Sequence, residues 1–206
     1  MKPLAPLLAA LLLAGCGTLD RPADTASSTT PATASGEFTI EVPEGWLKID
    51  RRTPATSAFL ARYAPSYPEL STFAELMKRP DSPFRLIAFA QSRTGAVEAT
   101  MNVIAVRLRK IDSFAEFERG MQTGLEKRSI LGSPRFRRHD LPAGEAVKVT
   151  YRIDPASTAG CTCVAITQYA VHAGGWAYIL TYSTVGEGKE RYAQVFERSA
   201  RSFRSD

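Results

Sequence analysis

Residues 36–46 read Gly-Glu-Phe-Thr-Ile-Glu-Val-Pro-Glu-Gly-Trp, and this stretch decides where the folded part of the chain begins. Apolar and polar residues alternate over residues 38–42, a pattern typical of a strand with one buried face. The Pro-Glu-Gly that follows predicts a turn. We therefore expect the first strand of a domain here, with Trp46 packed in its core. A ligand contact by Trp46 is the alternative.

The residues upstream of this stretch resemble an export signal. Lys2 is the only charge before Asp20, and residues 7–14 are wholly apolar. That run is too short to span a bilayer as a helix, which needs about 20 residues. A charged start followed by a short apolar core is typical of a secretory signal, so we predict a signal peptide over residues 1–15.

The sequence Leu-Ala-Gly-Cys at residues 13–16 resembles the lipobox of bacterial lipoproteins, whose cysteine is lipidated and becomes the mature N-terminus. We predict that Cys16 carries acyl chains such as palmitate, and two or more chains hold a protein firmly in a membrane. An ordinary signal with a chance cysteine is the alternative. The expected location is the extracytoplasmic face of a bacterial membrane.

Residues 16–35 are predicted to be the lipidated cysteine and a disordered tether, because their Ala, Thr, Ser, Pro and Asp cannot bury enough apolar surface to offset the entropy of ordering. Flexible-coil scaling gives the tether a reach of roughly 20–25 Å. Residues 36–206 then form one domain, which is long enough for a substantial core.

The domain is predicted to mix helices and strands. Residues 100–110 are apolar on both faces in the middle, so we expect this strand to be covered on both sides. Ser113 and Glu116 are spaced as a capping box at a helix start, and Gly120 and Gly124 would let this helix approach the sheet closely. Ala-Gly-Gly at residues 173–175 predicts a hairpin turn. Strands are expected over 38–42, 46–49, 84–91, 100–110, 136–141, 146–154, 162–172 and 176–183, and helices within 53–79, from 113 onward and over 189–203.

Four pieces of the chain, in this order and spacing, resemble the PsbP-like superfamily. That group includes an extrinsic photosystem protein, the nuclear Ran-release factor and bacterial lipoproteins of the DcrB and LpqN kind. The resemblance spans most of residues 36–206. The pieces are FTIEVPEGW at 38–46, NVIAVR at 102–107 followed by DSFAEF at 112–117, WAYILTYS at 176–183, and FERSARSF at 196–203.

The resemblance implies an α+β fold in which an antiparallel sheet is sandwiched between helices, an α/β/α arrangement. It also implies a non-enzymatic role in binding or assembly. Residues 53–79 look longer than the family's usual connection at this place. Because specificity tends to lie in variable connections, we predict that this segment flanks a ligand cleft with four aromatic residues: Phe59, Tyr63, Tyr67 and Phe73.

The sequence contains almost no recognisable motif for catalysis or metal binding. The two histidines are His139 and His172, and no Walker, Rossmann or nucleophile-elbow pattern occurs. Cys161 and Cys163 are the one pair that suggests a metal site, but His172 has the opposite parity in a strand and would face away from both. We therefore expect no catalytic residue, no cofactor and no metal. A hydrolase with an unrecognised active site is the alternative, and a perturbed carboxylate or His139 in a cleft would favour it.

Cys161 and Cys163 remain the only cysteines once Cys16 is lipidated. Residues two apart in a regular strand lie roughly 6.5–7 Å apart, at or beyond the usual disulfide range. A bond would need the chain to bend, which Gly160 could permit. A bent disulfide and two free thiols both stay open.

The net charge is +5, and several basic clusters stand along the chain. They include Arg135, Arg137 and Arg138, and Arg198 with Arg201 near the C-terminus, where Glu197 and Arg201 can pair at i, i+4. A solvated surface of mixed sign is one interpretation, since 21 acids are interspersed. A basic face toward anionic lipid or another envelope polyanion is the other. The export signal argues against nucleic acid.

The sequence thus predicts a lipid-anchored, non-enzymatic binding or scaffolding module of the cell envelope. Its expected contacts are the membrane, through the lipidated N-terminus, and an unidentified envelope protein or small ligand.

Overall fold

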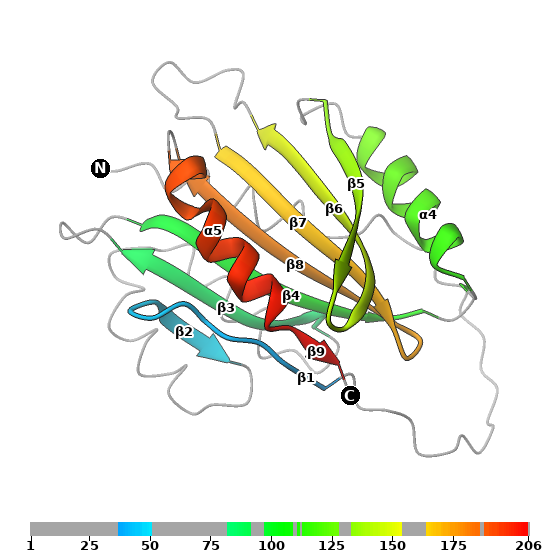
Figure 1. Cartoon of the computed structure of the whole chain (residues 1–206), viewed down its shortest axis with the longest axis horizontal. Helices are drawn as coiled ribbons and strands as arrows, with labels where there is room; N and C mark the ends of the chain where they lie inside the picture. The colour runs from blue at the N-terminus through cyan, green and yellow to red at the C-terminus, as the bar shows by residue number, and fades with distance from the viewer. Residues whose placement is uncertain are drawn as a thin grey trace.

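The computed structural model describes residues 37–50, 82–91, 97–108, 111, 113–127, 133–153, 164–185 and 188–205 (Figure 1). The predicted signal peptide, Cys16, the tether, the segment 53–79 with its four aromatic residues, and the Cys161–Cys163 pair lie outside the described residues.

Seven antiparallel strands form the main sheet in the order β2-β3-β4-β8-β7-β6-β5. The strands β4 and β8 lie side by side near the middle, and β2 and β5 are the edges. The long, β-branched and aromatic runs of the chain form these strands, as the sequence predicts. Their bounds are β2 Leu47–Asp50, β3 Phe84–Gln91, β4 Val97–Arg107, β5 Arg135–Leu141, β6 Gly144–Ile153, β7 Val164–Ala173 and β8 Trp176–Val185.

In the part of the chain that the structure describes, one helix packs on each face of this sheet. The helix α5, Gly188–Arg201, packs its Tyr192, Phe196 and Ala200 on one face, against a core that includes Met101, Val103, Leu180 and Tyr182. The helix α4, Phe114–Glu126, packs Phe117 and Leu125 on a second core that includes Val147, Val149, Ile166 and Ile179. The predicted α+β fold, an antiparallel sheet between helices, is therefore confirmed, as is the burial of β4 on both faces.

The first predicted strand is shorter than expected and joins another sheet. Only Phe38–Thr39 is a strand, β1, and it pairs with β9, Arg204–Ser205, in a two-stranded ladder. The next residues bind to α5: the Ser199 hydroxyl donates to the Glu41 carbonyl at 2.8 Å, and the Glu41 N–H donates to the Ser202 hydroxyl at 2.8 Å. These serine hydroxyls replace the ladder that would have continued the strand.

Phe38 is buried on the same face as α5, with ring centroids 6.1 Å from Tyr178 and 5.7 Å from Phe203. Trp46 is half-buried, and its ring meets Tyr192 and Phe196 edge-on at 6.0 and 6.4 Å. Both aromatic residues of the opening stretch therefore help to hold α5 to the sheet. No helix in the described part of the chain is long and apolar enough to cross a membrane.

The start of α4 confirms one half of the predicted capping box, because the Ser113 hydroxyl accepts a hydrogen bond from the Glu116 N–H at 3.2 Å. The sequence also suggested that Gly120 and Gly124 let α4 approach the sheet closely. That expectation is wrong: both glycines are exposed, and a Cβ at either would meet no atom within 4 Å. The turn predicted between residues 173 and 176 is present, and Gly174 and Gly175 have positive φ.

Candidate functional site

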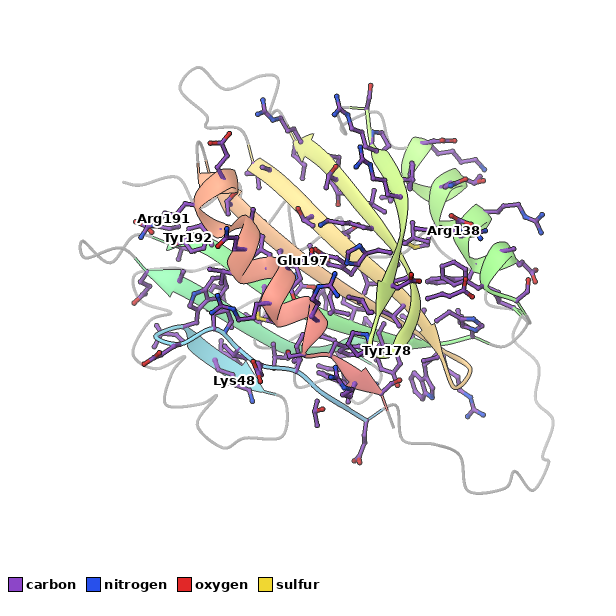
Figure 2. The ribbon with its side chains drawn as sticks, in the orientation of Figure 1. Lys48, Arg138, Tyr178, Arg191, Tyr192 and Glu197 are labelled. Atoms are coloured by element: carbon purple, nitrogen blue, oxygen red, sulfur yellow. The ribbon has the colours of Figure 1, made fainter. Side chains whose placement is uncertain are left out.

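Glu197 lies on α5, where Figure 2 labels it, and its carboxylate takes four donors from four elements. His139 of β5 lies 2.9 Å from its Oε1, and Arg201 Nε donates to the same oxygen at 3.1 Å. Lys148 Nζ of β6 and the Tyr169 hydroxyl of β7 donate to Oε2 at 2.9 and 2.5 Å. We call these five residues the Glu197 cluster.

Successive side chains of a strand point to opposite faces of the sheet, and this alternation explains why the side chains of the cluster meet. His139 and Lys148 belong to neighbouring rows of the β5–β6 ladder, on the face that α5 covers, and Lys148 is the register partner of Tyr169. Lys148 Nζ also lies 5.0 Å from the centre of the Tyr169 ring. The cluster therefore ties α5 to three strands of the sheet at once.

The surroundings shift two pKa values in the cluster. Burial alone would raise the pKa of Glu197, but the hydrogen bonds from Tyr169 and Lys148, with the charges of Lys148 and His139, outweigh it and lower this pKa to about 2. Burial raises the pKa of Tyr169, and so do its hydrogen bond to Glu197 and the charge of that carboxylate. Glu197 is thus ionised and Tyr169 neutral across the physiological range.

A second carboxylate holds the N-terminal half of α5. Glu98 Oε2 accepts from the Tyr192 hydroxyl at 2.8 Å and from Arg191 Nη1 at 3.0 Å. Burial raises the pKa of Tyr192, and the bond to Glu98 adds to this effect. In Figure 2, Arg191 and Tyr192 lie toward one end of α5 and Glu197 toward its middle. The helix is therefore anchored to the sheet at two points by polar contacts.

Exposed arginines are the main feature of the α5 side of the sheet beyond the Glu197 cluster. Arg135 and Arg137 share the parity of His139 on β5, and Arg152 shares that of Lys148 on β6, so all three lie on this side. Arg198 is exposed on α5 itself. Among the described residues, no ion pair involves any of these four. We call Arg135, Arg137, Arg152 and Arg198 the basic face.

Arg138 lies on the opposite face of β5 and, unlike the arginines of the basic face, it forms an ion pair. Arg138 donates from Nε and Nη2 to Glu118 Oε2 on α4 at 3.0 and 2.7 Å, and its guanidinium lies 5.7 Å from the Phe114 ring centre. The hydrogen bond from Arg138 to Glu118, and the charge of that carboxylate, raise the pKa of Arg138. Of the three arginines that the sequence grouped together, one pairs with the helix below the sheet and two face the other way.

A row of polar side chains is buried on the face of the sheet away from α5. Asn102, Thr181 and Gln168 are register partners across β4, β8 and β7, with Thr100 and Ser183 in the next row. All five are at most 7 % exposed. Thr100 and Ser183 share a hydrogen bond of 2.6 Å, and Gln168 donates to Thr181 at 3.0 Å. Asn102 Oδ1 and Gln168 Oε1 find no hydrogen-bond partner in the part of the chain that the structure describes.

The other residues that the sequence singled out divide into two groups. His172 stacks on Phe117 at 5.6 Å, facing α4, and so has a packing role. No group of three or more His, Cys, Asp or Glu among the described residues could hold a metal ion. Cys16, Cys161, Cys163, Phe59, Tyr63, Tyr67 and Phe73 lie outside the described residues, and the predictions about them stay predictions.

Sequence reasoning found the Glu197–Arg201 pair at i, i+4 but missed the rest of the cluster. His139 and Lys148 are nine residues apart on strands whose register decides whether they meet. The alternation of β5 was the available signal, because it places His139 and Arg138 on opposite faces. Without the register, nothing linked either residue to α5.

No model of a known protein family matches the sequence, and no curated protein matches it. Three of the solved structures that the chain is similar to are a cyanobacterial PsbP, LpqN and Mog1p. The solution structure of the PsbP of Synechocystis sp. PCC 6803 is 12% identical, with 88% of this chain and 98% of that chain covered and a TM-score of 0.47.

LpqN of Mycobacterium tuberculosis, described as involved in cell envelope biogenesis, is 12% identical over 83% of this chain and 85% of that chain, with a TM-score of 0.46. The Ran-binding protein Mog1p of Saccharomyces cerevisiae is 10% identical over 81% of this chain and 88% of that chain, with a TM-score of 0.46. The PsbP and LpqN resemblance that the sequence predicts is thus found among solved structures.

Proposed function

We propose that this protein is a bacterial envelope lipoprotein, anchored through acylated Cys16, whose domain is a non-enzymatic binding or scaffolding module for a protein partner or a small envelope ligand. The anchor is supported by the charged start, the short apolar run and the lipobox-like residues 13–16. The single observation that carries the binding role is the basic face, whose four arginines are exposed and have no ion pair among the described residues.

The anchor is tested by Cys16→Ser. In cells given labelled palmitate, the protein should incorporate label and its Cys16→Ser variant should not, because the serine hydroxyl does not replace the thiol as the acyl acceptor. The variant should also keep its signal peptide, as shown by intact mass. Equal labelling of the two proteins would refute the lipoprotein proposal.

The binding site for the partner or small ligand is proposed to include the segment 53–79, with Phe59, Tyr63, Tyr67 and Phe73 on the flank of the cleft. Specificity tends to lie in the connections that vary on a shared fold. Replacing residues 53–79 by a short Gly/Ser linker should preserve the thermal unfolding transition and remove the species that cross-link to the protein in intact envelopes. Cross-linked species that persist would place the site elsewhere.

A hydrolase is the second candidate, and one observation favours it: His139 contacts the carboxylate Glu197, as an imidazole base contacts the group that orients it. Two facts weigh against this function. The Glu197 oxygens already take four donors, and no hydroxyl of Ser or Thr and no thiol contacts His139 among the described residues. His139→Gln should therefore leave envelope cross-linking unchanged. Loss of a hydrolytic activity in this variant would favour the enzyme.

A further inference from the structure

We propose that the basic face docks the domain on the surface of an anionic phospholipid bilayer. This inference rests on the proposed function, since it presumes that the chain is tethered to a membrane. It adds which face of the domain meets the bilayer and which side chains make the contact.

The arginines of the basic face are placed as a surface and not as a pocket. Arg135 and Arg137 are two residues apart on β5, roughly 7 Å along the strand. Arg152 lies on the neighbouring strand, two residues beyond Thr150, the partner of Arg135, so it is offset from Arg135 by roughly 5 Å in the pairing direction and 7 Å along the strand. Arg198 adds a charge on α5. The cations are thus spread over exposed positions of two strands and a helix, which suits many separate phosphates better than one enclosed anion.

The acids of this side do not cancel the basic face. Glu197 is fully occupied by its own four donors, and Glu98 pairs with Arg191 and Tyr192. The cations of the Glu197 cluster, Lys148 and Arg201, are used in the same way. Among the described residues, Glu41 and Glu190 are exposed acids beside α5 without an ion pair, and Arg107 and Arg204 are exposed arginines without one. These two acids and two arginines balance, so the four arginines of the basic face remain as positive charge for a partner.

The start of the domain lies on the same side. Phe38 is buried in the core that α5 covers, against Tyr178 and Phe203, so the chain enters the domain on the α5 side of the sheet. Figure 1 shows β1 and β9 near the end of α5. A tether that reaches a membrane from this side brings the α5 side toward the bilayer, which a tether starting on the α4 side would not do.

Protection of a sheet edge is the other physical reason for arginines on β5. Edge strands carry charges that discourage pairing with a second chain. That reason explains Arg135 and Arg137, since β5 is an edge. It extends to Arg152, because β6 runs past its last pair with β5, Arg135–Thr150, and Arg152 pairs with β7 alone. It does not explain Arg198, which lies on the helix α5.

The test is co-sedimentation with vesicles of the chain from residue 16 onward, expressed without residues 1–15 and with Cys16→Ser so that it carries no acyl chains. The vesicles are phosphatidylcholine alone, or phosphatidylcholine with one third phosphatidylglycerol. Each Arg near an anionic surface strengthens binding about fivefold. The triple variant R135Q/R137Q/R152Q should therefore bind the anionic vesicles about a hundredfold more weakly, while the parent chain binds them in a salt-sensitive way and ignores the neutral ones.

The matched control is R119Q/K127Q/R138Q, which removes the same charge from the α4 side and should change vesicle affinity less than about threefold. R135K/R137K/R152K should bind like the parent, because a membrane surface reads charge and not the planar fork of arginine. If the glutamine triple does not fold, R152Q alone should weaken binding about fivefold.

Three results would overturn the proposal. The first is an equal loss of vesicle affinity in R135Q/R137Q/R152Q and in the control R119Q/K127Q/R138Q. The second is a loss of vesicle binding in R135K/R137K/R152K. The third is unchanged vesicle affinity in R135Q/R137Q/R152Q together with aggregation of this variant. The second result would indicate a partner that requires arginine geometry, and the third edge protection. If vesicle binding fails while Cys16 still takes up labelled palmitate, the docking proposal alone is refuted. If the vesicles are bound but Cys16 takes up no palmitate, the proposed lipid anchor alone is refuted.

Discussion

At the scale of single residues, the buried polar row is the least expected feature of the core. An acceptor buried without a donor costs about 1–3 kcal/mol, whereas a paired hydroxyl does not. Asn102 and Thr100 lie two residues apart on one face of β4, and only the first has an oxygen without a partner in the described part of the chain. They therefore form a matched pair for substitution.

Asn102→Leu should raise the free energy of unfolding by about 1 kcal/mol, because it removes the orphaned amide oxygen and keeps the branched outline of the side chain. Urea denaturation measures this quantity. Thr100→Val is the control and should lower it by about 1–2 kcal/mol, since it leaves the Ser183 hydroxyl buried without its partner. Destabilisation by both substitutions would show that the Asn102 amide is satisfied.

At the scale of elements, α5 is held by polar contacts as well as by its apolar stripe. The apolar residues of that stripe, Tyr192, Phe196 and Ala200, recur at helical spacing and are buried. Ser199 lies between them and is buried too, because its hydroxyl accepts from the Tyr182 hydroxyl at 3.1 Å and donates to Glu41. Spacing along one helix predicts which face is buried, but not which polar residues the sheet will satisfy.

Glu197→Gln should lower the free energy of unfolding by about 1–2 kcal/mol at neutral pH, since the amide cannot accept all four donors and carries no charge. The folded pKa of Glu197 is about 2, below its ordinary 4.5. The carboxylate therefore contributes its full stability above pH 4.5 and loses it as the pH falls toward 2. The gap between the parent and the variant should close over that window in denaturation curves.

Glu118→Gln is the control for this experiment, because Glu118 holds only the exposed Arg138. Its effect on the free energy of unfolding should stay below about 1 kcal/mol. A gap between parent and Glu197→Gln that is constant from neutral pH down to 2 would contradict the assigned pKa.

The sequence predicted elements better than contacts between them. The strand over 84–91 was placed correctly to the residue, and β5, β8 and α5 within one or two, because alternation and helical spacing are local signals. The β1–β9 ladder was missed, since it joins residues far apart in the chain through only two residue pairs. The Glu197 cluster was missed for the same reason: its members come from four elements, and only the sheet register brings them together.

At the scale of the whole molecule, Phe38 links the entry of the chain to its last strand. Its ring packs against Tyr178 of β8 and against Phe203, which lies between α5 and β9. Phe38→Ala should lower the free energy of unfolding by about 3 kcal/mol, the usual cost of truncating a buried phenylalanine. Thermal denaturation measures the change. Thr39→Ala, at an exposed position of the same strand, should change it by less than about 0.5 kcal/mol.

The two-residue ladder between β1 and β9 has a mechanical consequence. If the chain is anchored through Cys16 as proposed, any pull on the domain reaches Phe38 and Thr39 first, and Ser205 and Arg204 are their partners in the ladder. These bonds can peel one after another, whereas the long central strands must shear together. Under tension the tether should therefore lengthen by the residues up to Trp46 while the seven-stranded sheet stays intact. A pulling force from the envelope would then extend the tether without unfolding the domain.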